Sequence, residues 1–278
     1  MKTVKIGSTA WGLPGNGWYG PYMAHRAGLD GIQLELGSYE VGYPLAQRGV
    51  QEAYLEDAER YGIEYPAVVL NDLMVHGYAK GCNTEEGKIA FDMIELGLEV
   101  AHELDISEVM LPNFGENRIR EQEHFDNMIQ ALSFACERAL PFGITVLTEN
   151  PLAWDKQLEL LHTVGADNLK IHYDSQNMKY NWDLDQCEQL QRLYPYMTAQ
   201  LHVKDGDAKP APAGSAPLGT GNTDFRRQMQ ILRELGYTGW IITENYYCKP
   251  AMQGVTSARE SQWDSLVKDV ALLRETFG

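Results

Sequence analysis

The segment ITVLTEN at residues 144–150 is a short apolar, β-branched run that leads into a carboxylate, Glu149. A run of this length and composition is typical of a buried strand. Three later apolar runs also lead into a side chain that can bind a metal ion. They are LKIHYD (169–174) with Asp174, AQLHVKD (199–205) with His202, and WIITEN (240–245) with Glu244. Because open α/β folds and (β/α)8 barrels carry their chemistry at the carboxyl ends of parallel strands, we expect these four side chains to share one site.

Similar short runs occur along the whole chain and alternate with longer helical patterns, which predicts βα units and a parallel sheet. The chain has eight such runs, which is the number of strands that closes a (β/α)8 barrel. A length of 278 residues fits one such domain. We therefore predict an α/β fold, a single (β/α)8 TIM barrel domain over residues 1–278. The expected strands are KIGSTA (near 4–10), GIQLEL (31–36), YPAVVLN (65–71), EVMLPN (108–113), ITVLTEN (144–150), LKIHYD (169–174), TAQLHVKD (198–205) and GWIITEN (239–245).

The charge balance excludes several classes of partner. The chain has 23 Lys and Arg against 39 Asp and Glu, a formal net charge of −16. Nucleic acids and anionic membranes require a basic surface, so neither is an expected partner.

The N-terminus lacks a signal-peptide pattern, no stretch reaches the roughly 20 apolar residues of a membrane span, and the four cysteines form no CxxC pair. We expect a cytoplasmic protein that binds a small molecule.

The four candidate ligands form a mixed oxygen and nitrogen donor set. Such a set, with open coordination positions, suits Mn²⁺, Mg²⁺ or Co²⁺, and Zn²⁺ is also compatible with it. A lone Glu at a strand end is more often a helix cap or a surface carboxylate. The prediction of a metal site therefore depends on all four residues together.

Five segments, TENPL, YDSQN, LHVKD, LGTGNTDF and TENYY, resemble the xylose isomerase-like barrels in sequence and in order. The similarity is to their sugar and sugar-phosphate isomerase/epimerase branch, in particular the ketose 3-epimerases. It implies a (β/α)8 barrel that holds a divalent metal, preferably Mn²⁺, through Glu149, Asp174, His202 and Glu244. It also implies that Glu149 and Glu244 are the catalytic acid/base pair and that the chain forms a homo-oligomer, a dimer or a tetramer.

The activity implied by this resemblance is epimerisation or isomerisation of a keto sugar or sugar phosphate. A proton next to the ketone is removed and returned through a metal-stabilised enediolate. Inversion of a carbon requires proton transfer on two faces, which the two glutamates can supply, whereas aldose–ketose isomerisation can proceed with one base. Two alternatives remain open: a lyase on the same scaffold, such as a keto-polyol dehydratase or a C-glycoside-cleaving enzyme, and a sugar-binding barrel without turnover.

The sequence departs from the metal-dependent apurinic endonucleases, which resemble these barrels but hold three zinc ions with additional histidines. Asn177 stands where those enzymes have a His three residues after the Asp, and Asn113 stands where they have a His at the fourth strand end. After His202, the chain continues with Asp205-Gly-Asp207 and lacks their second Asp-x-His. We therefore expect a mononuclear centre and not a DNA repair enzyme.

Three asparagines are candidate substrate ligands. Asn71 and Asn113 end the third and fourth expected strands, and Asn177 follows the sixth. Their amides can hydrogen-bond sugar hydroxyls, although capping of the following loop is an equal alternative for the first two.

Three further residues complete the expected substrate-binding set. Glu35 ends the second strand, where a purely structural hydrogen bond is the alternative. Lys204 lies on the same strand face as His202, where it can contact a substrate oxygen or form an ion pair with Asp205 or Glu244. Trp11 can pack on a sugar face or in the core.

The irregular segment 206–222, rich in Pro, Ala and Gly, is either a lid or a surface loop, and its Gly219 and Gly221 amides are candidate phosphate donors.

Overall fold

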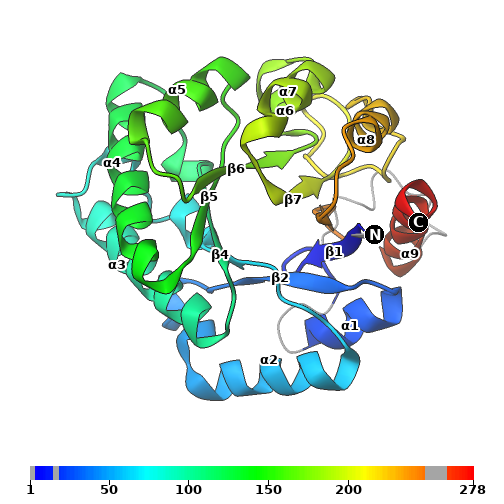
Figure 1. Ribbon diagram of the computed structural model, residues 1–278, viewed down its shortest axis with the longest axis horizontal. Helices are drawn as coiled ribbons and strands as arrows, with labels where there is room; N and C mark the ends of the chain where they lie inside the picture. Colours follow the sequence, from blue (N-terminus) through cyan, green and yellow to red (C-terminus); the bar gives the residue numbers. More distant parts are fainter. Residues whose placement is uncertain (1–3, 15–18, 248–261) are drawn as a thin grey trace. The chain divides into compact units, whose positions relative to one another are not determined.

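The computed structural model describes residues 4–14, 19–247 and 262–278, in which strands and helices alternate along the chain (Figure 1). The strands are β1 (Lys5–Thr9), β2 (Gly31–Glu35), β3 (Val68–Val69), β4 (Glu108–Pro112), β5 (Thr145–Glu149), β6 (Leu169–Asp174), β7 (Met197–Val203) and β8 (Trp240–Thr243). The helices are α1 (Gly20–Ala27), α2 (Arg48–Tyr61), α3 (Glu85–Glu103), α4 (Gln122–Ala139), α5 (Trp154–Val164), α6 (Asn177–Trp182), α7 (Gln186–Leu193), α8 (Phe225–Glu234) and α9 (Gln262–Phe277).

The strands follow one another in sequence order around a closed parallel barrel, from β1 to β8. This confirms the predicted (β/α)8 fold and all eight expected strand positions. The third strand is the largest departure, because only Val68–Val69 of the expected 65–71 run is a strand. Pro66 lies within that run and has no amide hydrogen to donate to a neighbouring strand.

Two compact units can be distinguished by their internal contacts. The first comprises Met1–Gln33, Glu56–Tyr65 and Tyr173–Gly278. Within it, β1 pairs with β2 and β8, and β7 pairs with β8 so that His202 lies opposite Ile242. Gly31 is required at the start of β2, since a side chain there would lie 2.4 Å from the carbonyl oxygen of Glu64 and 2.7 Å from the Trp240 ring.

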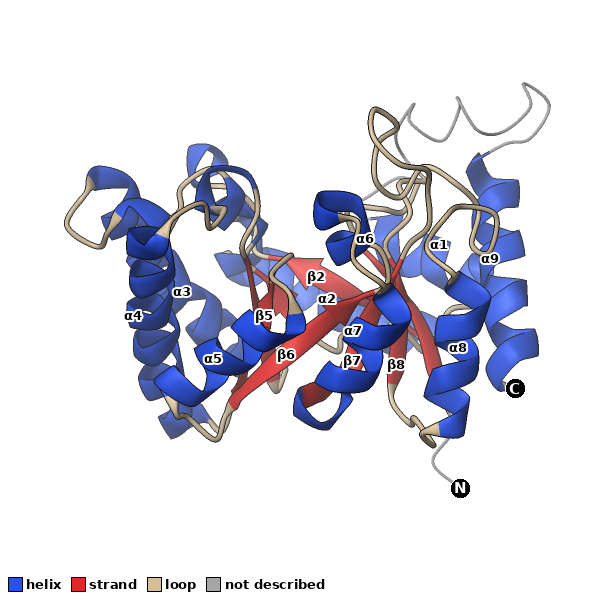
Figure 2. Cartoon of the chain, turned by 90° about the horizontal axis from the view of Figure 1, so that it is seen from above, coloured by secondary structure: helices blue, strands red, loops and turns tan. Residues whose placement is uncertain are grey.

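The second unit comprises Leu34–Leu55 and Pro66–His172. In it α3 and α4 lie side by side, next to α5 (Figures 1 and 2). Thr84 caps α3 by accepting a hydrogen bond of 3.0 Å from the Gly87 amide. The buried residues of α3 recur at helical spacing and so form one apolar face: Ala90, Met93, Ile94, Gly97, Leu98 and Ala101.

None of the helices in the described ranges is both long enough and apolar enough to cross a membrane.

Candidate metal centre

Three potential metal ligands converge at the carboxyl ends of strands in the first unit. Asp174 is the last residue of β6, His202 lies in β7, and Glu244 directly follows β8. Each offers a ligand atom within 4.8 Å of those of the other two, and all three side chains are buried. Two carboxylates and an imidazole gathered around one point are a donor set that suits a divalent cation.

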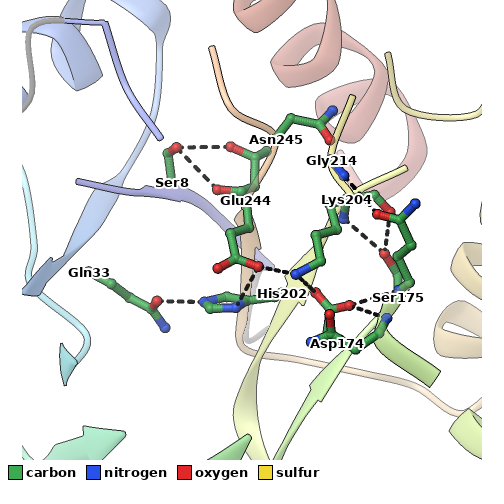
Figure 3. A network of polar contacts seen from close by, with 12 residues as sticks. Ser8, Gln33, Asp174, Ser175, His202, Lys204, Gly214, Glu244 and Asn245 are labelled. Atoms are coloured by element: carbon green, nitrogen blue, oxygen red, sulfur yellow. Dashed lines mark hydrogen bonds and ion pairs between the residues drawn. The ribbon is translucent and has the colours of Figure 1, made fainter. Parts of the chain in front are cut away.

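Lys204, two residues after His202, is also buried in this cluster (Figure 3). Its Nζ atom lies 2.5 Å from Glu244 Oε2 and 3.3 Å from Asp174 Oδ2. Of the two ion pairs considered for Lys204, the structure has the one with Glu244, and it adds Asp174 as a second partner. The ammonium group thus contacts two of the candidate metal ligands at once.

Glu244 lies in an environment that keeps it ionised. Burial alone would raise the pKa of its carboxyl group, but the charges of Lys204 and His202 and their hydrogen bonds hold that pKa well below its usual range. The Nδ1 atom of His202 lies 3.4 Å from Glu244 Oε2. Glu244 is therefore a carboxylate near neutral pH, the form that both binds metal and accepts a proton.

Asp174 is oriented by the start of α6. Its Oδ1 atom accepts hydrogen bonds from the backbone amides of Gln176 (2.8 Å) and Asn177 (2.6 Å), which directs Oδ2 towards Lys204. Asn177, a predicted substrate ligand, is buried and orients Asp174 through its backbone. The adjacent Ser175 exchanges hydrogen bonds of 2.7 and 2.9 Å with the backbone of Lys204, which aligns the ends of β6 and β7.

Two buried glutamines lie behind His202. His202 Nε2 is 2.6 Å from Gln33 Oε1, and Gln33 Nε2 donates to Gln200 Oε1 at 2.7 Å. Both glutamine side chains are fully buried. Neither glutamine was predicted as a site residue. Strand periodicity does indicate that Gln33 shares a strand face with Glu35 and that Gln200 shares one with His202.

Trp11, a predicted substrate ligand, follows β1 and contacts the centre. Its ring lies edge-on to the His202 imidazole, with 6.2 Å between centroids and 71° between planes. Trp11 therefore packs next to one of the candidate ligands.

The segment after β7 is held in place by Asp205. One carboxylate oxygen accepts from the Gly219 and Gly221 amides (2.9 and 3.0 Å), and the other from the Gly206 amide and the Thr223 hydroxyl (2.9 and 2.8 Å). The Gly219 and Gly221 amides considered as phosphate donors are therefore bonded to Asp205. A side chain at Gly221 would lie 2.3 Å from that carboxylate, so the loop requires glycine there.

In the second unit, Glu149 is the last residue of β5 and is buried. Its backbone carbonyl oxygen accepts a hydrogen bond of 2.8 Å from the backbone N–H group of Asn113. The Asn113 side chain is fully buried and donates to the Tyr78 hydroxyl at 2.7 Å. No described residue hydrogen-bonds the side-chain oxygen of Asn113.

The other two predicted substrate ligands of the second unit contact each other. Asn71 Nδ2 donates to Glu35 Oε2 at 3.0 Å, a hydrogen bond between the segment that follows β3 and the last residue of β2. This pair agrees with the structural alternative for Glu35.

A second histidine–carboxylate cluster lies in the second unit. His76 Nδ1 is 2.5 Å from Glu86 and Nε2 is 3.0 Å from Glu40, with Asp72 close to both His76 and Glu40. Burial lowers the pKa of His76, but its hydrogen bonds to Glu86 and Glu40 outweigh this effect and raise that pKa overall. Both ring nitrogens of His76 are thus engaged by carboxylates.

Comparisons with known proteins agree with this architecture. The chain is 27% identical over 235 residues, 83% of each sequence, to 2-epi-5-epi-valiolone 7-phosphate 2-epimerase of Actinoplanes sp.. Its fold is similar to that of D-allulose 3-epimerase from Methylomonas sp., with a TM-score of 0.76, 16% identity and 99% of each chain covered. D-psicose 3-epimerase from Clostridium cellulolyticum H10 also gives a TM-score of 0.76, at 14% identity over 98% of this chain and 99% of that one.

The family model described as xylose isomerase-like TIM barrel matches residues 21–268, nearly the whole chain. The observed order of the eight strands is that of such a barrel. The protein therefore belongs to the xylose isomerase-like TIM barrel family.

Proposed function

We propose that the protein is a divalent-metal-dependent epimerase or isomerase of a keto sugar or its phosphate. The observation that carries the proposal is the convergence of Asp174, His202 and Glu244 within 4.8 Å at the carboxyl ends of neighbouring strands. The activities that the similar proteins are named for, epimerisation of 2-epi-5-epi-valiolone 7-phosphate and of D-allulose, support this reaction class.

Glu149 is the proposed fourth ligand. It ends β5, which precedes β6 in the barrel order, and its side chain is buried. Three carboxylates and one imidazole fit Mn²⁺, our first choice, and also Mg²⁺, Co²⁺ or Zn²⁺. A bound divalent cation would act as a Lewis acid on the ketone and so make the neighbouring C–H group more acidic.

The two glutamates would move the proton. Glu244 is held in its ionised form and can accept the proton from the carbon beside the ketone. Inversion of that carbon requires delivery of a proton to the opposite face, and we assign this step to Glu149, with the roles exchanged in the reverse direction. A shuttle between adjacent carbons, as in isomerisation, would need only one of them.

The remaining predicted residues would bind the substrate. The Lys204 ammonium group would donate to a substrate oxygen. The Asn113 side-chain oxygen, buried and without a partner among the described residues, would accept from a sugar hydroxyl. Trp11 would pack against the sugar face. We retain Asn71, Asn177 and Glu35 as polar contacts further from the reacting carbon.

We further propose that the chain is one domain, assembles as a dimer or tetramer and acts in the cytoplasm. The single family model that spans residues of both units supports the first point. Light scattering coupled to size-exclusion chromatography tests the assembly.

The decisive assay is proton exchange with solvent. The Mn²⁺-loaded protein is incubated in D₂O with ketoses and ketose phosphates, and deuterium next to the carbonyl is measured by NMR and mass spectrometry. We expect incorporation into at least one substrate and its epimer, and a loss of about 10³-fold in Glu149→Gln and Glu244→Gln. The surface variant Glu159→Gln is the matched control and should exchange at the wild-type rate.

Absence of exchange with every ketose and ketose phosphate would refute the proposal. A product lighter by one water would show elimination, and the enzyme would then be a lyase.

A further inference from the structure

Three fully buried side chains of the first unit form a continuous hydrogen-bonded row: Gln200, Gln33 and His202. Gln200 and His202 lie in β7 and Gln33 lies in β2, so the row joins two strands that are far apart in the sequence. The Gln33 amide lies between the other two side chains, 2.7 Å from Gln200 and 2.6 Å from His202. Figure 3 shows its oxygen directed at the imidazole.

The two contacts of Gln33 differ in polarity. A side-chain amide has one end that donates and one that only accepts. Because the Gln33 NH₂ group donates to Gln200 Oε1, its oxygen is the end that meets His202. An oxygen acceptor 2.6 Å from Nε2 requires that Nε2 carries a hydrogen.

A hydrogen fixed on Nε2 determines the chemistry of the other ring nitrogen. Nδ1 lies 3.4 Å from Glu244 Oε2, among the candidate ligands. With Nε2–H retained, Nδ1 is the position that can exchange a proton for a metal ion. A histidine ligand commonly has its second nitrogen held in this way, which fixes both tautomer and ring orientation.

We propose that Gln33 is a positioning residue that holds His202 in its Nε2–H form and directs Nδ1 towards the metal, and that Gln200 acts through Gln33 by fixing the direction of its amide. The metal part of this inference rests on the proposed function. The position of the ring hydrogen does not depend on it.

The first test is spectroscopic and uses the metal-free protein. Histidine labelled with ¹⁵N shows which ring nitrogen carries hydrogen, and the His202 signals are assigned by their loss in His202→Asn. We expect a slowly exchanging hydrogen on Nε2 in the wild type, retained in Gln33→Glu, which preserves an acceptor, and lost or in rapid exchange in Gln33→Leu. A wild-type ring with hydrogen only on Nδ1 would overturn the proposal.

The second test is a double-mutant cycle on Mn²⁺ affinity, measured by electron paramagnetic resonance of free Mn²⁺. Gln33→Leu should weaken binding about 10- to 100-fold, the usual effect of losing the partner of a ligand histidine. Gln200→Leu should weaken binding less, because the Gln33 amide is then free to turn its NH₂ group towards His202. If Gln200 acts only through Gln33, Gln200→Leu should have no further effect in the Gln33→Leu background.

Gln157→Leu is the matched control, since Gln157 is an equally buried glutamine of α5 that donates to the Leu152 carbonyl, and Mn²⁺ affinity should not change. Additive losses at Gln33 and Gln200, or unchanged affinity in Gln33→Leu, would contradict the proposal while leaving the proposed function intact. A wild type that binds no Mn²⁺ would contradict the proposed function, and the ring-hydrogen measurement would still test this inference.

Discussion

Two clusters in the molecule contain the same residue types but use histidine differently. In the first unit, His202 gives one ring nitrogen to a neutral amide and directs the other towards Glu244. In the second unit, both nitrogens of His76 are taken by the carboxylates of Glu86 and Glu40. The two imidazoles thus differ in their partners: His202 faces an amide oxygen and a carboxylate of the candidate ligand set, and His76 faces two carboxylates.

The largest predicted effect concerns the two histidines. His202→Asn should lower Mn²⁺ affinity by about 100-fold or more, since it removes a ligand, whereas His76→Asn should change it by less than about threefold. Titration of each variant with Mn²⁺ under one set of conditions measures both. Equal losses at the two positions would show that the clusters are not distinct in function.

Removal of the buried ammonium group should mainly lower the stability of the protein. Lys204→Met leaves Asp174 and Glu244 without their shared counter-ion, which should cost the metal-free protein about 3–5 kcal/mol. Mn²⁺ would then neutralise the same carboxylates, so the rise in Tm on adding Mn²⁺ should be larger in this variant than in the wild type.

The matched control is Lys80→Met, which breaks an exposed pair with Glu116 and should change stability little. Thermal unfolding with and without Mn²⁺ gives the Tm of the wild type, Lys204→Met and Lys80→Met. A Lys204→Met protein as stable as the wild type without metal would show that Lys204 is not the counter-ion of the centre.

The smallest predicted effect is the pH dependence of the His76 cluster. Because hydrogen bonds to Glu86 and Glu40 raise the folded-state pKa of His76, its stabilisation is complete below the unfolded-state value of about 6.5. That stabilisation is lost as pH rises through the higher folded-state pKa. The free energy of unfolding of wild type minus His76→Gln should be below about 1 kcal/mol and should decrease with pH over this window.

Urea unfolding at a series of pH values measures this difference. His25→Gln is the control, because His25 Nδ1 contacts the backbone carbonyl oxygen of Tyr61 at 2.9 Å. A stability difference that grows with pH would contradict the assigned ion pairs.

The sequence predicted the barrel well because strand ends are local features. An apolar run followed by a polar residue is visible within seven residues, as in ITVLTEN, and the (β/α)8 order then follows from the number of such runs. The one poorly predicted strand is β3, because the expected run 65–71 contains Pro66, and the effect of its missing amide hydrogen on strand length depends on the neighbouring strand.

The contacts around the ligands could not be predicted to the same extent. Periodicity places Gln33 and Gln200 on definite strand faces, but their contact joins residues 167 apart in the sequence and depends on the barrel register. For the same reason the sequence left two partners open for Lys204, of which the structure has Glu244. The Gly219 and Gly221 amides were candidate phosphate donors because their bonds to Asp205 are not visible in the sequence.

Anomalous diffraction from crystals of the Mn²⁺-loaded protein locates the bound metal ion and so tests directly whether the candidate ligands form a metal centre. We predict one strong peak per chain, bounded by Asp174, His202 Nδ1, Glu244 and Glu149. A main peak at Glu40, Asp72 and His76, or no peak at any protein ligand, would contradict the proposed metal centre.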